Sequence, residues 1–324
     1  MKTEYNFDYL IEKINDIDFE TSPFKHIYIE NFFSAEHFDE IQSAQEIASP
    51  QAKNDEELIF GLKEKGFKPI QFPGCVTDEK KYIKWHSKDS IAQNHSATEG
   101  FGMVLRLYKF ESKILAALNK FLIGDKFNKA LAKKFDVSFT DCVIDGGIQK
   151  YLDGYEISPH PDIRKKAATF MVNINPSDEA DLLNHHTHYL RLNPSKAYVT
   201  TFWKENLDIE REWVPWSWAK TVKQQTKNNS IVCFSPSNDT LHGVKADYDH
   251  LLTQRTQLYG NLWYKESPTT TIASWELLDL ATNARNAGKK ILKDDMVRLL
   301  PNSVKTMVKK VINSKNEIGK RNID

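Results

Sequence analysis

The chain has 324 residues, of which 40% are hydrophobic and 27% are charged, a composition that is ordinary for a soluble globular protein. Lys plus Arg and Asp plus Glu are equal at 44 each, so the formal net charge is zero. Because proteins that bind nucleic acid over a large surface usually carry a basic excess, this balance argues against nucleic acid as a partner.

The cysteines and the N-terminus favour a reducing compartment. Cys75, Cys142 and Cys233 form no CxxC pair, which argues against a disulfide framework and against a cysteine-type zinc site. The first residues are polar, and no apolar run reaches the ~18 residues that a transmembrane helix needs. We therefore expect a cytoplasmic protein without a transmembrane segment.

The first part of the chain has the pattern of helices and loops. A short helix is expected around 9–17, and the alternating β-formers of 24–29 predict a strand. Ser34 is a good N-cap residue for the helix that follows it. Prolines and many charges predict loops over 48–100, with one short helix near 55–64.

Two more helices are expected before the β-rich part. Apolar residues recur at helical spacing over 103–123, which predicts a long buried helix, and a second helix is expected over 125–134. From Phe135 onward, β-branched and aromatic residues alternate between turn signals. Strands are expected over 135–143, 148–152, 157–162, 167–174, 188–192, 197–202, 230–234, 242–245 and 254–264, with a turn at Gly146-Gly147, a hairpin around Asn193-Pro194 and a helix over 216–225.

This order of elements predicts an α+β fold with a mainly β core, built as a jelly roll or barrel. Helices come before and after the strands, which disfavours a doubly wound parallel sheet. We expect supporting helices and a strand in 1–134, the β core in 135–267 with an insertion over 176–229, and a basic helical tail in 268–324. Such a tail can dock on its own domain, bind a membrane surface or form a homodimer, and the sequence leaves the choice open.

Two short stretches carry residues that suit a metal site. His160-Pro161-Asp162 follows a predicted strand and a glycine turn, and His242 follows another strand and turn. Two imidazoles and one carboxylate are the ligands of a mononuclear non-haem Fe(II) centre, which leaves coordination positions open. Arg255 lies on the next predicted strand. In a jelly roll, strands distant in sequence converge at one mouth, so these residues can meet there.

Four stretches together carry a resemblance to a known family. They are Tyr151–Asp162, Ala167–Asn175, Asn229–Pro236 with Leu241–Val244, and Arg255–Leu258. They resemble the double-stranded β-helix core of the 2-oxoglutarate/Fe(II)-dependent dioxygenase superfamily, in its prolyl 4-hydroxylase-like branch. The strand and helix start over 27–34 also resemble the opening of many members.

The resemblance implies that His160, Asp162 and His242 bind Fe(II). It also implies that Arg255 binds the C5 carboxylate of 2-oxoglutarate, for which its planar fork offers two parallel hydrogen bonds. A carboxylate at 162 favours hydroxylation over halogenation, because halogenating relatives lack this ligand.

A second contact to the same co-substrate carboxylate is expected from Tyr151, Thr169 or Asn173. Thr169 and Asn173 share one face of the predicted strand 167–174. Many relatives carry Ser or Thr two positions after the arginine, where this chain has Gln257.

The function that the resemblance implies is a dioxygenase, most readily a hydroxylase, that uses Fe(II), 2-oxoglutarate and O2 and releases succinate and CO2. The expected substrate is an amino acid, a peptidyl residue or a sugar-type metabolite. A different class, a non-catalytic cupin- or lectin-like jelly roll that binds or senses a metal, stays open, although the intact triad with Arg255 argues against it. A nucleic-acid demethylase is disfavoured by the zero net charge.

Three further features have two interpretations each. The run 185–188 holds three histidines, which cannot all face one ion on a strand, so we expect a loop with one member facing the substrate. The four tryptophans within 203–218 either pack the insertion onto the core or line a cleft for a sugar or an aromatic ligand. Arg164 either meets an anionic substrate or is a solvated surface charge.

Overall fold

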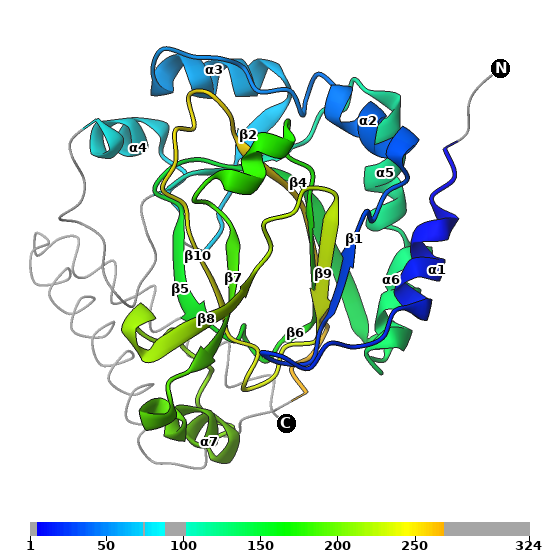
Figure 1. The fold of residues 1–324 in the computed structure, drawn as a ribbon, viewed down its shortest axis with the longest axis vertical. Helices are drawn as coiled ribbons and strands as arrows, with labels where there is room; N and C mark the ends of the chain where they lie inside the picture. Colours follow the sequence, from blue (N-terminus) through cyan, green and yellow to red (C-terminus); the bar gives the residue numbers. More distant parts are fainter. Residues whose placement is uncertain (1–4, 74, 88–101, 269–324) are drawn as a thin grey trace, which may run out of the picture. The chain divides into compact units, whose positions relative to one another are not determined.

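The structure is a computed structural model that describes residues 5–73, 75–87 and 102–268. Two antiparallel sheets dominate this part of the chain and pack against each other (Figure 1). The larger sheet contains, from edge to edge, β1 (Ile27–Glu30), β9 (Ser230–Phe234), β6 (Lys166–Asn173), β11 (Arg255–Tyr264), β4 (Cys142–Tyr151), β3 (Val104–Leu107) and β2 (Phe67–Pro69). The smaller sheet contains β5 (Glu156–His160), β10 (His242–Lys245), β7 (Thr187–Leu192) and β8 (Ala219–Gln224).

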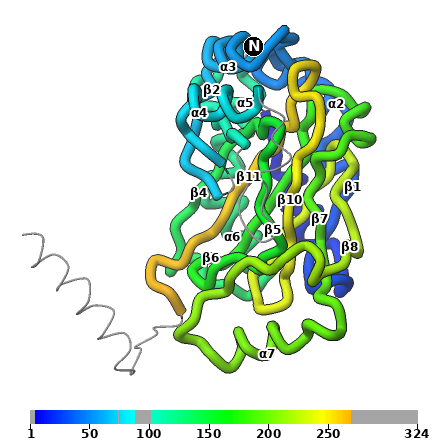
Figure 2. Tube along the Cα trace, turned by 90° about the vertical axis from the view of Figure 1, so that its left-hand side faces the viewer, coloured from blue at the N-terminus to red at the C-terminus, as the bar shows by residue number. Residues whose placement is uncertain are grey.

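From β4 to β11 the chain passes repeatedly between the two sheets. Strands β4, β6, β9 and β11 lie together in the larger sheet, whereas β5, β7, β8 and β10 make up the smaller one. Figure 2 shows the strands of the smaller sheet side by side, and the pairing places β10 between β5 and β7. This winding is a double-stranded β-helix, so the predicted α+β, mainly β jelly roll is confirmed.

Helices cover the outer face of the larger sheet (Figure 1). Leu10, Leu118 and Leu131, from three different helices, are buried in one core with Val172 of β6 and Leu258 of β11. Figure 2 shows α3 and α7 at opposite ends of the two sheets. The helices are α1 (Asp8–Asp16), α2 (Ala35–Ser43), α3 (Asp55–Glu64), α4 (Glu79–His86), α5 (Lys113–Leu122), α6 (Asp125–Lys134) and α7 (Tyr198–Glu205).

The N-terminal helix predictions are confirmed by α1, α3 and α6. The Ser34 hydroxyl accepts a hydrogen bond from the backbone N–H of His37 at 3.3 Å, so it caps α2 as predicted. The α2 residues Phe38 and Ile41, three positions apart, are buried on the side that faces the core.

The long helix predicted over 103–123 is wrong, because the segment forms strand β3 and then helix α5. Val104 pairs with Tyr151 of β4, and Leu107 pairs with Phe67 of β2. Almost all of β3 is buried, so its residues do not alternate between apolar and polar. A short strand of that kind cannot be distinguished from a buried helix by periodicity alone.

The turn predicted at Gly146-Gly147 is also wrong, since both glycines lie within β4. Gly146 pairs with Gly260 of β11, where a Cβ on Gly146 would stand 2.9 Å from the carbonyl oxygen of Tyr259. The glycine therefore marks a close approach of two strands. The strand predicted over 135–143 begins only at Cys142, after a short 3-10 helix, Phe139–Asp141.

Three predictions within 176–229 are wrong as well. The strand predicted over 197–202 is helix α7, in which Val199 and Trp203, four positions apart, are buried. There is accordingly no hairpin at Asn193-Pro194, and a short 3-10 helix, Pro194–Lys196, leads into α7 instead.

The helix predicted over 216–225 is instead a 3-10 helix, Trp216–Trp218, followed by edge strand β8. Most β8 residues are exposed, so the strand lacks the apolar alternation that would identify it. Because β7 and β8 both come from 176–229, this segment supplies half of the smaller sheet.

Some predictions about organisation are not tested here. The basic tail predicted over 268–324 lies, apart from its first residue, outside the described residues. The division between 1–134 and 135–267 stays a prediction, although β1, β2 and β3 belong to the same sheet as the core strands. In the described ranges, no helix is long and apolar enough to cross a membrane.

Candidate metal and anion site

The two histidines of the predicted triad are neighbours across two strands. His160 is the last residue of β5, His242 is the first residue of β10, and the two are directly paired in the antiparallel register. Their ring centroids are 4.3 Å apart. The pairing of one strand end with one strand start therefore brings together two residues that are far apart in sequence.

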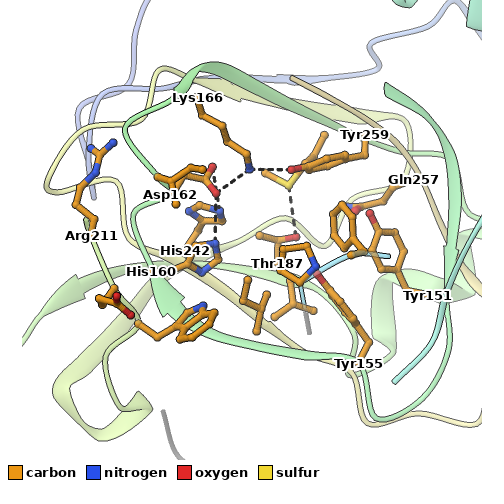
Figure 3. A pocket seen from close by; sticks show the side chains of 18 of the residues that line it. Tyr151, Tyr155, His160, Asp162, Lys166, Thr187, Arg211, His242, Gln257 and Tyr259 are labelled. Carbon is orange, nitrogen blue, oxygen red and sulfur yellow. Dashed lines mark hydrogen bonds and ion pairs between the residues drawn. The ribbon is translucent and has the colours of Figure 1, made fainter. Parts of the chain in front are cut away.

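Asp162 completes the cluster from the turn that follows β5. Its φ of 63° is in the left-handed region, which Asp tolerates better than most residues and which carries local strain. Its two carboxylate oxygens lie 3.4 Å from Nε2 of His160 and 3.7 Å from Nε2 of His242. The three ligand atoms all lie within 4.8 Å of one another, and all three residues are buried. The structure thus brings the predicted triad together (Figure 3).

Both imidazoles are held so that Nε2 faces the cluster. Nδ1 of His160 lies 2.9 Å from the carbonyl oxygen of Ser158, and Nδ1 of His242 lies 3.0 Å from that of Thr240. A carbonyl can only accept, so Nδ1 carries a proton in each ring, and Nε2 is the ring atom that is turned toward the cluster. Burial, together with His160, lowers the pKa of His242 to about 3, so this ring is neutral.

The carboxylate of Asp162 is held by groups that the sequence did not single out for this role. Nζ of Lys166 lies 2.7 Å from one carboxylate oxygen, and Oγ1 of Thr169 lies 3.3 Å from the other. Lys166 is itself fixed by the Tyr259 hydroxyl at 2.9 Å. Burial alone would raise the pKa of Asp162, but Lys166 and the two histidines lower it well below its usual range. Asp162 is therefore an anion.

Replacing Lys166 with Met should raise the pKa of Asp162, because the ammonium is the largest influence that lowers it. A nearby opposite charge lowers a carboxyl pKa, and its removal raises it. Protons should then displace a metal ion at a higher pH than in the unaltered protein. Mn(II) binding followed while the pH is lowered measures this shift, with the exposed Lys220 replaced by Met as the control. An unchanged pH midpoint would contradict the proposed role of Lys166.

The triad opens into a cavity of about 310 Å³ that runs between the two sheets. Arg255, the first residue of β11, lines this cavity and is 2% exposed. It donates a hydrogen bond to the Thr187 hydroxyl at 2.8 Å and lies over the Tyr151 ring. Its Nη1 has no hydrogen-bond partner among the described residues. A buried guanidinium with donors to spare is suited to an anionic ligand.

The other predicted co-substrate residues lie in different places. Tyr151 lines the cavity, whereas Thr169 and Asn173 are not among its lining residues. Thr169 bonds to Asp162 and to Asn261, and the Asn173 amide donates to the backbone carbonyls of Gln225 and Lys227. These contacts make Thr169 a support for the carboxylate and Asn173 a support for the sheet.

Residues that the sequence analysis missed also line the cavity. Within the histidine-rich run 185–188, Thr187 lines the cavity, whereas none of the three histidines does. Met171 lies on the same strand face as Thr169 and does line it. Gln257 lines it too and donates to Asn173 at 2.8 Å. The available signal was that every second side chain of β6 and of β11 points to the same face of the sheet. This alternation could not indicate which position in each strand reaches the cavity.

The structure also shows where the tryptophans of 203–218 and Arg164 lie, for which the sequence left two interpretations. Trp203 is buried in a small core with Val199, Val214 and Leu241, so it packs the segment onto the β core. Trp213 lines the cavity and is 37% exposed. Arg164 is buried and donates to the carbonyl oxygens of Trp203 and Ile209, so it is neither a solvated charge nor a cavity residue.

A second cluster of histidines and carboxylates lies outside the cavity. Asp55 of α3 lies 2.8 Å from His86 of α4 and 2.8 Å from His250, and His86 also lies 3.1 Å from Asp153. Its groups thus lie closer together than Asp162 lies to the two histidines of the triad, at 3.4 Å and 3.7 Å. We interpret it as a charge network that joins two helices to two loops. No sequence motif indicated this cluster, because its members are scattered over 55–250.

The pH dependence of this network follows from its pKa shifts. The carboxylates of Asp153 and Asp55 accept hydrogen bonds from the His86 ring and raise its pKa from 6.5 to about 9. The stabilisation from a raised pKa is fully present below pH 6.5 and is lost as the pH rises through 9. We expect His86→Gln to lower the free energy of unfolding by up to about 3 kcal/mol at mildly acidic pH. The difference should shrink above pH 9, as measured by urea denaturation; a difference that does not depend on pH would contradict this account.

Comparisons with known proteins add only weak similarities. No protein-family model matches the sequence, and no curated protein matches it. A solved prolyl hydroxylase from Trichoplax adhaerens, in complex with a hypoxia inducible factor oxygen degradation domain peptide fragment, is 11% identical, with a TM-score of 0.41 over 83% of this chain and 92% of that one.

Two further solved structures are similar to the chain. A Pseudomonas putida prolyl-4-hydroxylase is 10% identical, with a TM-score of 0.37 over 79% of this chain and 99% of that one. EvdO2 from Micromonospora carbonacea var. aurantiaca, complexed with 2-oxoglutarate, is 9% identical, with a TM-score of 0.26 over 77% of this chain and all of that one (100%). Similarity at this level leaves the activity to be inferred from the residues of this chain.

Proposed function

We propose that this protein is an Fe(II)- and 2-oxoglutarate-dependent dioxygenase that hydroxylates a metabolite or a peptidyl residue. One observation carries the proposal: two imidazole Nε2 atoms and a carboxylate converge in the same cavity as a buried guanidinium with unused donors. The triad alone would suit several divalent metals. Arg255 adds the reason to expect an anionic co-substrate beside the metal.

The residues present fit a ferrous ion. His160 and His242 offer Nε2 atoms, and the other nitrogen of each ring is anchored to a backbone carbonyl. Asp162 offers an anionic carboxylate, which keeps acceptor capacity beyond its contacts with Lys166 and Thr169. When bound there, Fe(II) would supply the oxidative chemistry in which O2 and 2-oxoglutarate give succinate, CO2 and a hydroxylated product.

The chain's own residues would position the co-substrate. Arg255 would hold its distal carboxylate with two N–H groups, Thr187 would fix the guanidinium, and the Tyr151 ring would lie against it. The apolar walls of the cavity would exclude water from the reacting groups. Tyr259 and Lys166 would keep the carboxylate of Asp162 ionised and oriented.

A non-catalytic jelly roll that binds or senses a metal is the alternative from another class. Such a protein needs the triad but has no use for a buried, unneutralised Arg255 in the same cavity, and a buried charge without a partner is costly. That cost favours the enzyme.

The test is a screen of amino acids, peptides and sugar-type metabolites, scored by succinate release. Succinate should form only when Fe(II), 2-oxoglutarate and O2 are all present, and the true substrate should increase it. The variant to compare in this screen is His242→Ala, and its matched control is His188→Ala. His188 lies on the adjacent strand and pairs with Gly243. Metal binding without succinate under any condition would favour the sensor.

A further inference from the structure

A second buried arginine lines the cavity and is not used by the proposed co-substrate site. Arg211 is 7% exposed and belongs to the cavity wall. Among the described residues, its guanidinium has no hydrogen bond or ion pair, and Nε is buried without a partner. Burial lowers its pKa to about 10, with Arg164 contributing, so it stays protonated at neutral pH.

The two carboxylates that act electrostatically on Arg211, those of Glu210 and Asp162, are already engaged elsewhere. One oxygen of Glu210 accepts the backbone N–H groups of Arg164 and Arg211, each at 3.0 Å, and lies 3.8 Å from Nε of Arg164. Asp162 is bonded to Lys166. Both carboxylates raise the pKa of Arg211 only through space. A guanidinium in this position is incompletely neutralised, which is costly unless an anionic ligand completes it.

Arg211 lies on the opposite side of the triad from the proposed co-substrate site. In Figure 3, Arg211 lies beyond Asp162 on one side of the two histidines, whereas Thr187, Tyr151 and Gln257 lie on the other. Arg255 belongs to the second group, because it bonds to Thr187. If 2-oxoglutarate places one carboxylate at the metal and the other at Arg255, both of its charges are matched. Arg211 is then left for a different anion.

The surroundings of Arg211 indicate what kind of anion this is. Glu210 and Glu212 line the same wall, and they would repel a dianion such as a phosphate monoester. A single guanidinium matches one carboxylate in charge and in geometry. Ile163 and Trp213, which follow Asp162 and Glu212 in the chain, also line the cavity and suit an apolar body.

We propose that Arg211 binds the carboxylate of the primary substrate, which is therefore a free carboxylic acid with an apolar body, an apolar amino acid included. A peptidyl residue or a neutral sugar would leave the guanidinium unmatched. The proposal rests on the proposed function, since the dioxygenase reaction is what makes the bound acid a substrate.

The test compares each acid with its own primary amide. A panel of aliphatic and aromatic carboxylic acids and L-amino acids, each paired with its amide, is titrated calorimetrically into protein loaded with Mn(II) and 2-oxoglutarate. At least one acid should bind roughly 10–100-fold more tightly than its amide, the range expected for charge-assisted hydrogen bonds. This preference should vanish in Arg211→Gln, return in part in Arg211→Lys and persist in Arg191→Gln, an arginine on the exposed side of β7.

Binding of Mn(II) and 2-oxoglutarate to each variant is measured in the same experiment. If the unaltered protein binds both but no acid is preferred over its amide, or if Arg211→Gln keeps the preference, Arg211 is not the substrate anchor and the dioxygenase proposal stands. If the unaltered protein binds neither Mn(II) nor 2-oxoglutarate, the dioxygenase proposal itself fails. If Arg211→Gln does not fold, the preference for an acid over its amide is compared between Arg211→Lys and the unaltered protein. That comparison still decides whether Arg211 is the substrate anchor.

Discussion

Replacing His242 with Ala is expected to abolish metal binding at the triad. Removing a ligand should exceed the roughly 10–100-fold loss of affinity that is typical when only an outer partner of a ligand is removed. The two remaining donors, His160 and Asp162, would then share a buried site in which a cation is poorly solvated. Anaerobic equilibrium dialysis with Fe(II), or with Mn(II) in air, measures the change.

The matched control for this variant is His188→Ala. His188 lies on β7, the strand next to β10, and pairs with Gly243, but it belongs to neither histidine–carboxylate cluster found in the described part of the chain. Circular dichroism should show that both variants are folded. Equal loss of metal in the two variants, or metal retained in His242→Ala, would mean that the triad is not the binding site.

Replacing Arg255 with Gln is expected to weaken 2-oxoglutarate far more than it weakens the metal. Truncating one partner of a buried charged hydrogen-bonded pair costs about 2–5 kcal/mol, which is roughly 30-fold to several thousand-fold in affinity. Arg255 is not a member of the triad, so the affinity for Mn(II) alone should change by no more than a few-fold. Calorimetric titration of 2-oxoglutarate into Mn(II)-loaded protein separates the two effects.

Two further variants show whether the fork of Arg255 matters. Arg255→Lys keeps the charge but loses the paired N–H geometry, so its affinity should fall between those of the unaltered protein and Arg255→Gln. Arg191→Gln removes an exposed arginine and should have no effect. If Arg255→Gln weakened metal and 2-oxoglutarate to the same extent, the co-substrate carboxylate would be held elsewhere.

Much of the fold could be predicted because the β core has local signals. Strand β9 is a short apolar run between turns, and helix α6 has its boundaries where the pattern placed them. The errors came where packing overrides local pattern. Three of the four residues of strand β3 are apolar and buried, so the strand has the apolar character of a buried helix, and most of edge strand β8 is exposed, so it lacks apolar alternation.

The site residues, too, could be predicted only in part. His160 and His242 could be paired in advance because both stand at strand ends that a jelly roll brings to one mouth. The supports of Asp162 could not be foreseen, since Lys166 lies four positions later and is itself held by Tyr259 from another strand. Arg211 carries no sequence signal at all. Its significance comes from burial and from a missing partner, which only the packed chain reveals.

The most direct test of the central claim is an anaerobic titration of the protein with Fe(II) and 2-oxoglutarate, followed by visible absorption. The account predicts a weak charge-transfer band that needs both ligands, is absent in His242→Ala and requires much more 2-oxoglutarate in Arg255→Gln. No band from the folded, unaltered protein, or a band that survives in His242→Ala, would contradict a 2-oxoglutarate-binding iron centre at His160, Asp162 and His242.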